Sequence, residues 1–159
     1  MASGDTLCTF VAPGESPATN GSVFTTRNEH PVESFDDTTN QSIIFSGILP
    51  QHYGGGGVTV YLHWTAVAVT GDVDWDVAWE NLVAQDIDSD GFAAVNSADN
   101  NAPSGTSGIP VIDTVAFTDG ADMDSVDKGN AFRLKITRDA SSDTMTGDAE
   151  LIRVEVRET

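Results

Sequence analysis

The segment VTVYLHW, residues 58–64, decides the fold class of this chain. Apolar and polar residues alternate along it, so that one face is formed by Val58, Val60, Leu62 and Trp64 and the other by Thr59, Tyr61 and His63. A period of two is typical of a β-strand that buries one face, whereas a helix needs apolar residues three or four positions apart. We therefore expect a strand here, with Tyr61 and His63 facing outward.

The same alternation recurs in FRLKIT (132–137), IRVEVR (152–157) and VDWDVAWE (73–80). In the second of these, Ile152, Val154 and Val156 are expected to face inward, and the preceding Leu151 breaks the phase, which indicates a bulge or the start of the strand. A short helix over 76–83 is an alternative in the third, but alternation favours a strand. Weaker strands are expected at Leu7–Val11, Ser22–Thr26, Ile43–Leu49, Phe92–Val95 and Pro110–Thr118.

Clusters of Gly, Asn, Asp and Pro separate these segments, as turns do in all-β proteins. The pattern predicts a single-domain antiparallel β-sandwich of about eight or nine strands, jelly-roll-like, with the strand order left open. Within it we expect residues 41–159 to form the sandwich core. Residues 1–40 are expected to form an extended N-terminal arm with short strands, packed on the domain or on a neighbour.

The formal net charge of −18 over 159 residues is unusually negative. Residues 1–127 carry 19 acids and the single base Arg27, whereas residues 128–159 carry six bases and six acids. Nucleic acid and anionic membranes are therefore not expected as partners, because both are bound through clustered Lys and Arg. The sequence begins without a secretory signal pattern, and its one cysteine, Cys8, allows no intrachain disulfide.

The stretch DIDSDGF, residues 86–92, resembles the first half of a calcium-binding loop, with Asp86, Asp88 and Asp90 as candidate ligands. A complete loop would place a bidentate Glu at position 97, where this chain has Ser97. Chance D-x-D-x-D runs are expected in so acidic a chain. An acidic turn is therefore favoured, calcium is kept as an alternative, and no other cofactor is expected.

Catalytic signatures are missing from the sequence: there is no G-x-S-x-G segment and no zinc-binding histidine spacing. The aromatic residues raise the alternative of a sugar-binding platform on a β-sandwich. Trp64 and Trp75 fall on the apolar faces of their strands, so we expect them to be buried. Tyr61 and His63 form the more credible surface pair.

Two segments, FSGILPQHYGGGGVTVYLHWTA (45–66) and FTDGADMDSVDKGNAFRLKITRDASSDTMTGDAELIRVEVRET (117–159), resemble small virion structural proteins of tailed bacteriophages. Among these, the chain resembles capsid decoration (cement) proteins. The resemblance implies a jelly-roll-like homotrimer made in the host cytoplasm. It would sit on the capsid exterior of the virion, bind the major capsid protein and stabilise the shell without enzymatic activity.

The leading hypothesis at this point is therefore a non-enzymatic capsid decoration protein. Its expected contacts with the capsid or with other subunits are the outward residues Arg133, Lys135, Arg153, Arg157, Tyr61 and His63. The alternative is a tail-fibre or tail-tip module that binds a receptor or a carbohydrate, with calcium at the three aspartates as an added option. Exposed tryptophan or tyrosine side chains gathered in one patch would favour this alternative.

Overall fold

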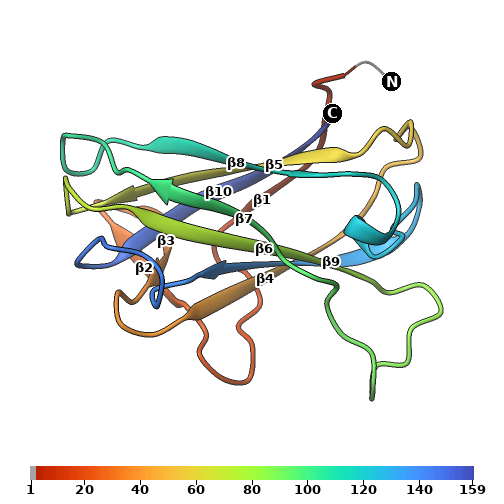
Figure 1. The fold of residues 1–159 in the computed structure, drawn as a ribbon, viewed down its shortest axis with the longest axis horizontal. Coiled ribbons are helices and arrows are strands. Elements are labelled where there is room, and N and C mark those ends of the chain that lie inside the picture. Colours follow the sequence, from red (N-terminus) through yellow and green to blue (C-terminus); the bar gives the residue numbers. More distant parts are fainter. Residues whose placement is uncertain (1–2) are drawn as a thin grey trace.

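A computed structural model describes residues 3–159 and places two antiparallel β-sheets face to face (Figure 1). In this range there are ten strands and one 3₁₀ turn, Ala121–Met123. The strands are β1 (Thr6–Val11), β2 (Val23–Arg27), β3 (His30–Phe35), β4 (Gln41–Ile48), β5 (Val58–Ala66), β6 (Val73–Asn81), β7 (Asn96–Asn101), β8 (Val111–Phe117), β9 (Ala131–Arg138) and β10 (Ala149–Glu158). None of the helical segments among the described residues has the length and apolar character to cross a membrane.

One sheet has six strands in the order β2-β3-β10-β5-β8, with β1 also paired to β10. The other has four strands in the order β4-β9-β6-β7. Strand β10 joins the N-terminal strands to the six-stranded sheet, because β3 pairs with its first half and β1 with its second half. The fold is thus the expected all-β antiparallel sandwich, and the three strands of residues 6–35 belong to one of its two sheets.

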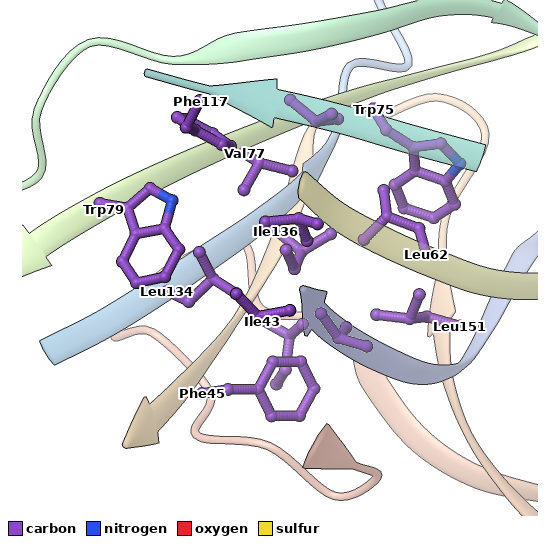
Figure 2. Packing of buried hydrophobic residues seen from close by; sticks show 14 of the residues in the cluster. Ile43, Phe45, Leu62, Trp75, Val77, Trp79, Phe117, Leu134, Ile136 and Leu151 are labelled. Carbon is purple, nitrogen blue, oxygen red and sulfur yellow. The ribbon is translucent and has the colours of Figure 1, made fainter. Parts of the chain in front are cut away.

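The core lies between the two sheets and is built from the inward residues of the alternating strands (Figure 2). Trp64, Trp75 and Trp79 have no exposed surface, and the rings of Trp64 and Trp75 meet edge to face with centroids 5.8 Å apart. The expected burial of Trp64 and Trp75 is confirmed. Trp75 and Trp79 lie on strand β6 and not on a helix. Alternate residues of a strand point to the same face, so both side chains are buried together.

Two strands differ from expectation because their sequences are polar. The segment NSADNN forms the edge strand β7, although a strand was expected just before it at Phe92–Val95. The segment HPVESF forms β3, whose Glu33 is buried and accepts hydrogen bonds from the Gly14 amide and the Ser22 hydroxyl. Strand β7 can be polar because it lies at the edge of its sheet, and β3 can bury Glu33 because that carboxylate is hydrogen-bonded. Neither strand shows hydrophobic alternation.

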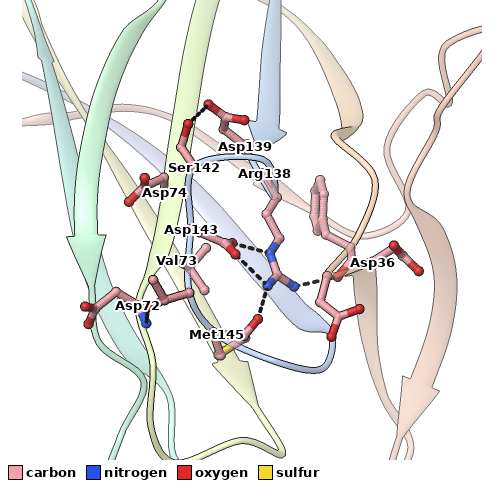
Figure 3. Close-up of polar contacts among 12 residues, drawn as sticks. Asp36, Asp72, Val73, Asp74, Arg138, Asp139, Ser142, Asp143 and Met145 are labelled. Carbon is pink, nitrogen blue, oxygen red and sulfur yellow. Dashed lines mark hydrogen bonds and ion pairs between the residues drawn. The ribbon is translucent and has the colours of Figure 1, made fainter.

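Arg138 continues the inward phase of β9 and is completely buried (Figure 3). Its Nε donates to Asp143 Oδ2 at 2.6 Å, and the other guanidinium nitrogens donate to the carbonyls of Phe35, Met145 and Gly147. This buried clamp holds the connection between β9 and β10 against the end of β3. It thereby fixes the start of β10, the strand on which the candidate site rests.

Candidate functional site

The outer face of the six-stranded sheet, meaning the face turned away from the core, carries a pocket of about 430 Å³. Its lining comes from the β2–β3 hairpin, from β3, β5 and β10, and from the segment that leads into β8: Arg27, Asn28, His30, Val32, Thr65, Gly108, Pro110 and Ile152. Apolar side chains from β3 and β10 therefore lie among polar side chains from the hairpin. This mixture is typical of sites for small polar ligands with apolar faces.

The β2–β3 hairpin presents Arg27 and His30 side by side. These two residues are directly paired across a two-residue turn, and the turn residues Asn28 and Glu29 have φ values of 47° and 66°. Positive φ at both positions defines the turn type that matches the twist of paired strands. The His30 Nδ1 lies 2.8 Å from the Asn28 carbonyl, so it must carry the proton and leaves Nε2 for another partner.

Arg27 reaches across the outer face of the sheet to two distant segments. Its Nη1 is 2.7 Å from Glu150 Oε2 on β10, and its Nη2 donates to Ser107 Oγ at 3.1 Å. A Cβ atom at Gly108, where φ is +82°, would lie 3.3 Å from Nη2, so a side chain there would crowd the guanidinium. The connection 102–110 and the hairpin are therefore tied together over the sheet, which closes one side of the pocket.

A bulge in β10 supplies the pocket residue Ile152. The register between β10 and β5 shifts between Leu151 and Arg153, and Leu151 is buried whereas Ile152 lines the pocket. The expected bulge is confirmed, but the expectation that Ile152 faces the core was wrong. The extra residue leaves Leu151 and Val154 in the core and turns Ile152 and Arg153 outward.

Next to the pocket on the same face, Tyr61 and His63 of β5 meet Glu155 and Arg157 of β10. The Arg157 guanidinium lies 4.1 Å from the centre of the Tyr61 ring and 2.8 Å from Glu155. The hydrogen bond from Arg157 holds the pKa of Glu155 at about 2, and the Thr6 hydroxyl also donates to this carboxylate. Burial lowers the pKa of His63, whose Nε2 is buried without a hydrogen bond.

The six residues expected to form one contact surface lie on opposite faces of the sandwich. Tyr61, His63, Arg153 and Arg157 belong to the six-stranded sheet, whereas Arg133 and Lys135 belong to β9 of the four-stranded sheet. Those last two side chains have partners within the chain, because Arg133 pairs with Glu80 at 2.9 Å and Lys135 lies 4.6 Å from the centre of the Phe92 ring.

The three aspartates of the calcium-like stretch lie in the long connection between β6 and β7. Asp86 accepts from the Asp88 amide, and the Asp90 carboxylate accepts from the Asp86 amide, so two of the three carboxylates cap their own turn. Within residues 3–159, no group of three or more His, Cys, Asp or Glu side chains is arranged to hold a metal ion.

Sequence reasoning did not identify Arg27 and His30 as site residues. Arg27 had one signal, since it is the single base among 19 acids in residues 1–127. The contacts that give it a role lie 80 and 123 positions away, at Ser107 and Glu150, and no local pattern connects them. Ile152 was assigned to the core because the alternation was counted from the wrong side of the bulge.

The fold is shared with carbohydrate-binding modules. A family 35 carbohydrate-binding module from an environmental isolate superposes with a TM-score of 0.55 and 10% identity, and the match covers 94% of this chain and 92% of that one. A xylan-binding module, CBM15, gives a TM-score of 0.51 and 12% identity over 96% of this chain and 97% of that one. Neither a family model nor a curated protein matches the sequence.

These comparisons overturn the expected resemblance to capsid decoration proteins. The solved structures that share the fold over nearly the whole chain are modules whose names describe carbohydrate binding, and nothing in the comparisons supports a virion or capsid role. The hypothesis of a capsid decoration protein of tailed bacteriophages was therefore wrong. The fold agrees better with the alternative, a β-sandwich module that binds a receptor or a carbohydrate.

Proposed function

We propose that this chain is a non-catalytic carbohydrate-binding module whose site is the pocket on the outer face of the six-stranded sheet. The observation that carries the proposal is the pocket itself: about 430 Å³, with Val32 and Ile152 among its apolar residues and the hairpin residues Arg27 and His30 among its polar ones. A sugar ring has apolar C–H faces and a rim of hydroxyl groups. Such a ring needs both kinds of contact.

The polar groups of the pocket suit hydroxyl ligands in particular. With its proton on Nδ1, His30 can accept a hydroxyl hydrogen at Nε2. Asn28 adds an amide with both a donor and an acceptor, and Arg27 has N–H donors beyond the two that bind Glu150 and Ser107. The tryptophans are buried, so this site would hold a sugar by hydrogen bonding and apolar contact rather than on an aromatic platform.

The absence of a carboxylate from the pocket lining supports binding without catalysis. None of its eight lining residues is Asp or Glu, whereas glycoside hydrolysis uses a pair of carboxyl groups that flank the scissile bond. Glu150 lies beside the pocket, but its carboxylate is held by Arg27.

Affinity gel electrophoresis against soluble xylan, β-glucan, mannan, polygalacturonate and alginate tests the proposal. We expect at least one of these polysaccharides to retard the protein. His30→Ala should then weaken that retardation by about tenfold, because one hydrogen bond to the sugar is lost.

The matched control is His52→Ala. His52 is an exposed turn residue before Val58, and it therefore lies near the end of β5 opposite Thr65 of the pocket, about 23 Å away along the strand. Retardation should be unchanged in this variant. If no polysaccharide retards the wild-type protein, or if both histidine variants behave alike, the proposed site is refuted.

A further inference from the structure

We infer that the saccharide taken by this site carries an acidic group, a carboxylate or a sulfate, and that Arg153 is the residue that selects it. This inference rests on the proposed function and adds the chemical class of the ligand. Its starting point is the placement of the bases. In a chain with a net charge of −18, three of the seven Lys and Arg residues lie on the outer face of one sheet: Arg27, Arg153 and Arg157.

Two of these three arginines are already neutralised on the face. Arg27 pairs with Glu150 at 2.7 Å, and Arg157 pairs with Glu155 at 2.8 Å. The side chain of Arg153 is exposed and takes part in none of the side-chain hydrogen bonds, ion pairs or ring contacts found within residues 3–159. Arg153 is therefore the one arginine of these three whose side chain forms no ion pair with a carboxylate.

Arg153 also lies at the edge of the pocket. It follows Ile152, which lines the pocket, and the bulge places both residues on the outer face. Across the sheet Arg153 is paired with His63, which is two positions from the pocket residue Thr65. Residues two apart on one face of a strand are about 7 Å apart, so the guanidinium is within reach of a group that projects from a pocket-bound sugar.

A guanidinium recognises planar or tetrahedral oxyanions through paired N–H donors, and this geometry fits carboxylates and sulfates alike. An unpaired arginine contributes little to folding, since surface ion pairs and free surface charges change stability only slightly. Retaining Arg153 unpaired beside a pocket, on a protein that otherwise repels anions, is explained by an anionic ligand. The surrounding acidic surface would then orient that ligand toward the one face that attracts it.

Among the other bases, Lys128 provides a matched control. Its side chain forms no ion pair or ring contact within residues 3–159 and is exposed in the turn between Asp127 and Gly129, none of which lines the pocket. Substitution of either residue by glutamine removes one positive charge and breaks no internal ion pair.

The experiment compares each acidic polysaccharide with its own neutralised form: polygalacturonate and alginate with their carboxyl-reduced products, and a sulfated galactan with its desulfated product. Binding is measured by titration calorimetry for the wild type, Arg153→Gln and Lys128→Gln. We expect the acidic member of at least one pair to bind about tenfold tighter to the wild type, because a hydrogen bond to a charged group is added. Arg153→Gln should remove this preference, and Lys128→Gln should keep it.

Which pair shows the preference decides between a carboxylate and a sulfate. The inference is overturned if neutralised and acidic forms bind alike, or if Arg153→Gln retains the preference; in either case binding of the neutral forms would leave the proposed function intact. Failure of every polysaccharide, acidic or neutral, would instead remove the proposed function itself. Equal melting temperatures of the three proteins confirm that folding is not the cause.

Discussion

Arg138 is a buried charge whose donors are shared between one carboxylate and the backbone. Asp143 is almost as completely buried, with 2% of its side-chain surface exposed. The carbonyls of Phe35, Met145 and Gly147 accept further hydrogen bonds, and those to Phe35 and Met145 are fully buried. Removing one side of such a network leaves the other side buried and unpaired, which costs far more than the pair itself contributes.

We therefore expect Arg138→Met to lower the free energy of unfolding by about 3–5 kcal/mol, which is the typical cost of a buried charge left without its partner. Chemical denaturation followed by tryptophan fluorescence measures this loss. Lys128→Met is the control, since an exposed base without an ion pair should change stability by less than about 0.5 kcal/mol. Similar stabilities of the two variants would show that Arg138 does not act as a clamp.

At this scale, the sequence predicts inward and outward positions well but not the partners of each residue. Phe132, Leu134 and Ile136 were expected to face inward and do so. One further step of the same alternation places Arg138 inward as well, yet the hydrophobic pattern stops at that residue because it is charged. The carbonyls that make its burial tolerable come from loops whose conformation no local pattern reveals.

The β2–β3 hairpin is the element that builds the candidate site, and its turn has a suboptimal sequence. Asn28 is well suited to positive φ, but Glu29, with φ of 66°, is not, because a Cβ atom in the left-handed region costs about 1–2 kcal/mol. Gly is the residue that this turn type prefers at the second position. The strain sits next to His30 and Arg27, the two side chains that the hairpin places at the pocket.

Glu29→Gly should therefore raise the free energy of unfolding by about 0.5–1 kcal/mol, after the greater flexibility of glycine in the unfolded chain is taken into account. Glu29→Ala removes the same carboxylate but keeps the Cβ atom, so no such gain is expected from it. Equilibrium denaturation compares the two variants. A gain in both would point to the lost negative charge rather than to the backbone as the cause.

The sequence predicts a β-strand where one face of the strand is apolar. It does not predict a strand that is defined only by hydrogen bonds to its neighbour. The four strongly alternating segments all form strands, and the weaker ones at Leu7–Val11, Ser22–Thr26, Ile43–Leu49 and Pro110–Thr118 lie within one or two residues of β1, β2, β4 and β8. Strand β7 is polar because it is an edge strand. The pocket depends on the hairpin and on the connection 102–110, which come together only through tertiary structure.

The whole molecule combines a net charge of −18 with a closely packed sandwich core. Five bases have acidic or aromatic partners, and their ion pairs neutralise four of the 25 acids, Glu150, Glu80, Asp143 and Glu155. On the four-stranded sheet, burial raises the pKa of Asp76, and the nearby charges of Asp139, Asp99 and Asp74 add to this effect. Mutual repulsion of this kind opposes folding and is weakened by salt.

Sodium chloride should therefore stabilise this protein at pH 7, in contrast to proteins whose folds depend on surface ion pairs. Between 0.02 and 0.5 M salt the Debye length falls from about 20 Å to about 4 Å, which screens repulsion between most surface carboxylates. We expect the melting temperature to rise by about 3 °C over this range, as a gain of about 1 kcal/mol would produce in a domain of this size. Differential scanning calorimetry at pH 7 measures the effect, and the same series at pH 4 provides the control.

The sequence pI is about 4.1, so the net charge of the protein is close to zero at pH 4, and the rise in melting temperature should largely vanish there. An equal rise at both pH values would assign the effect to salting out of apolar surface, and a fall at pH 7 would mean that attractive pairs such as Arg27–Glu150 outweigh the repulsion.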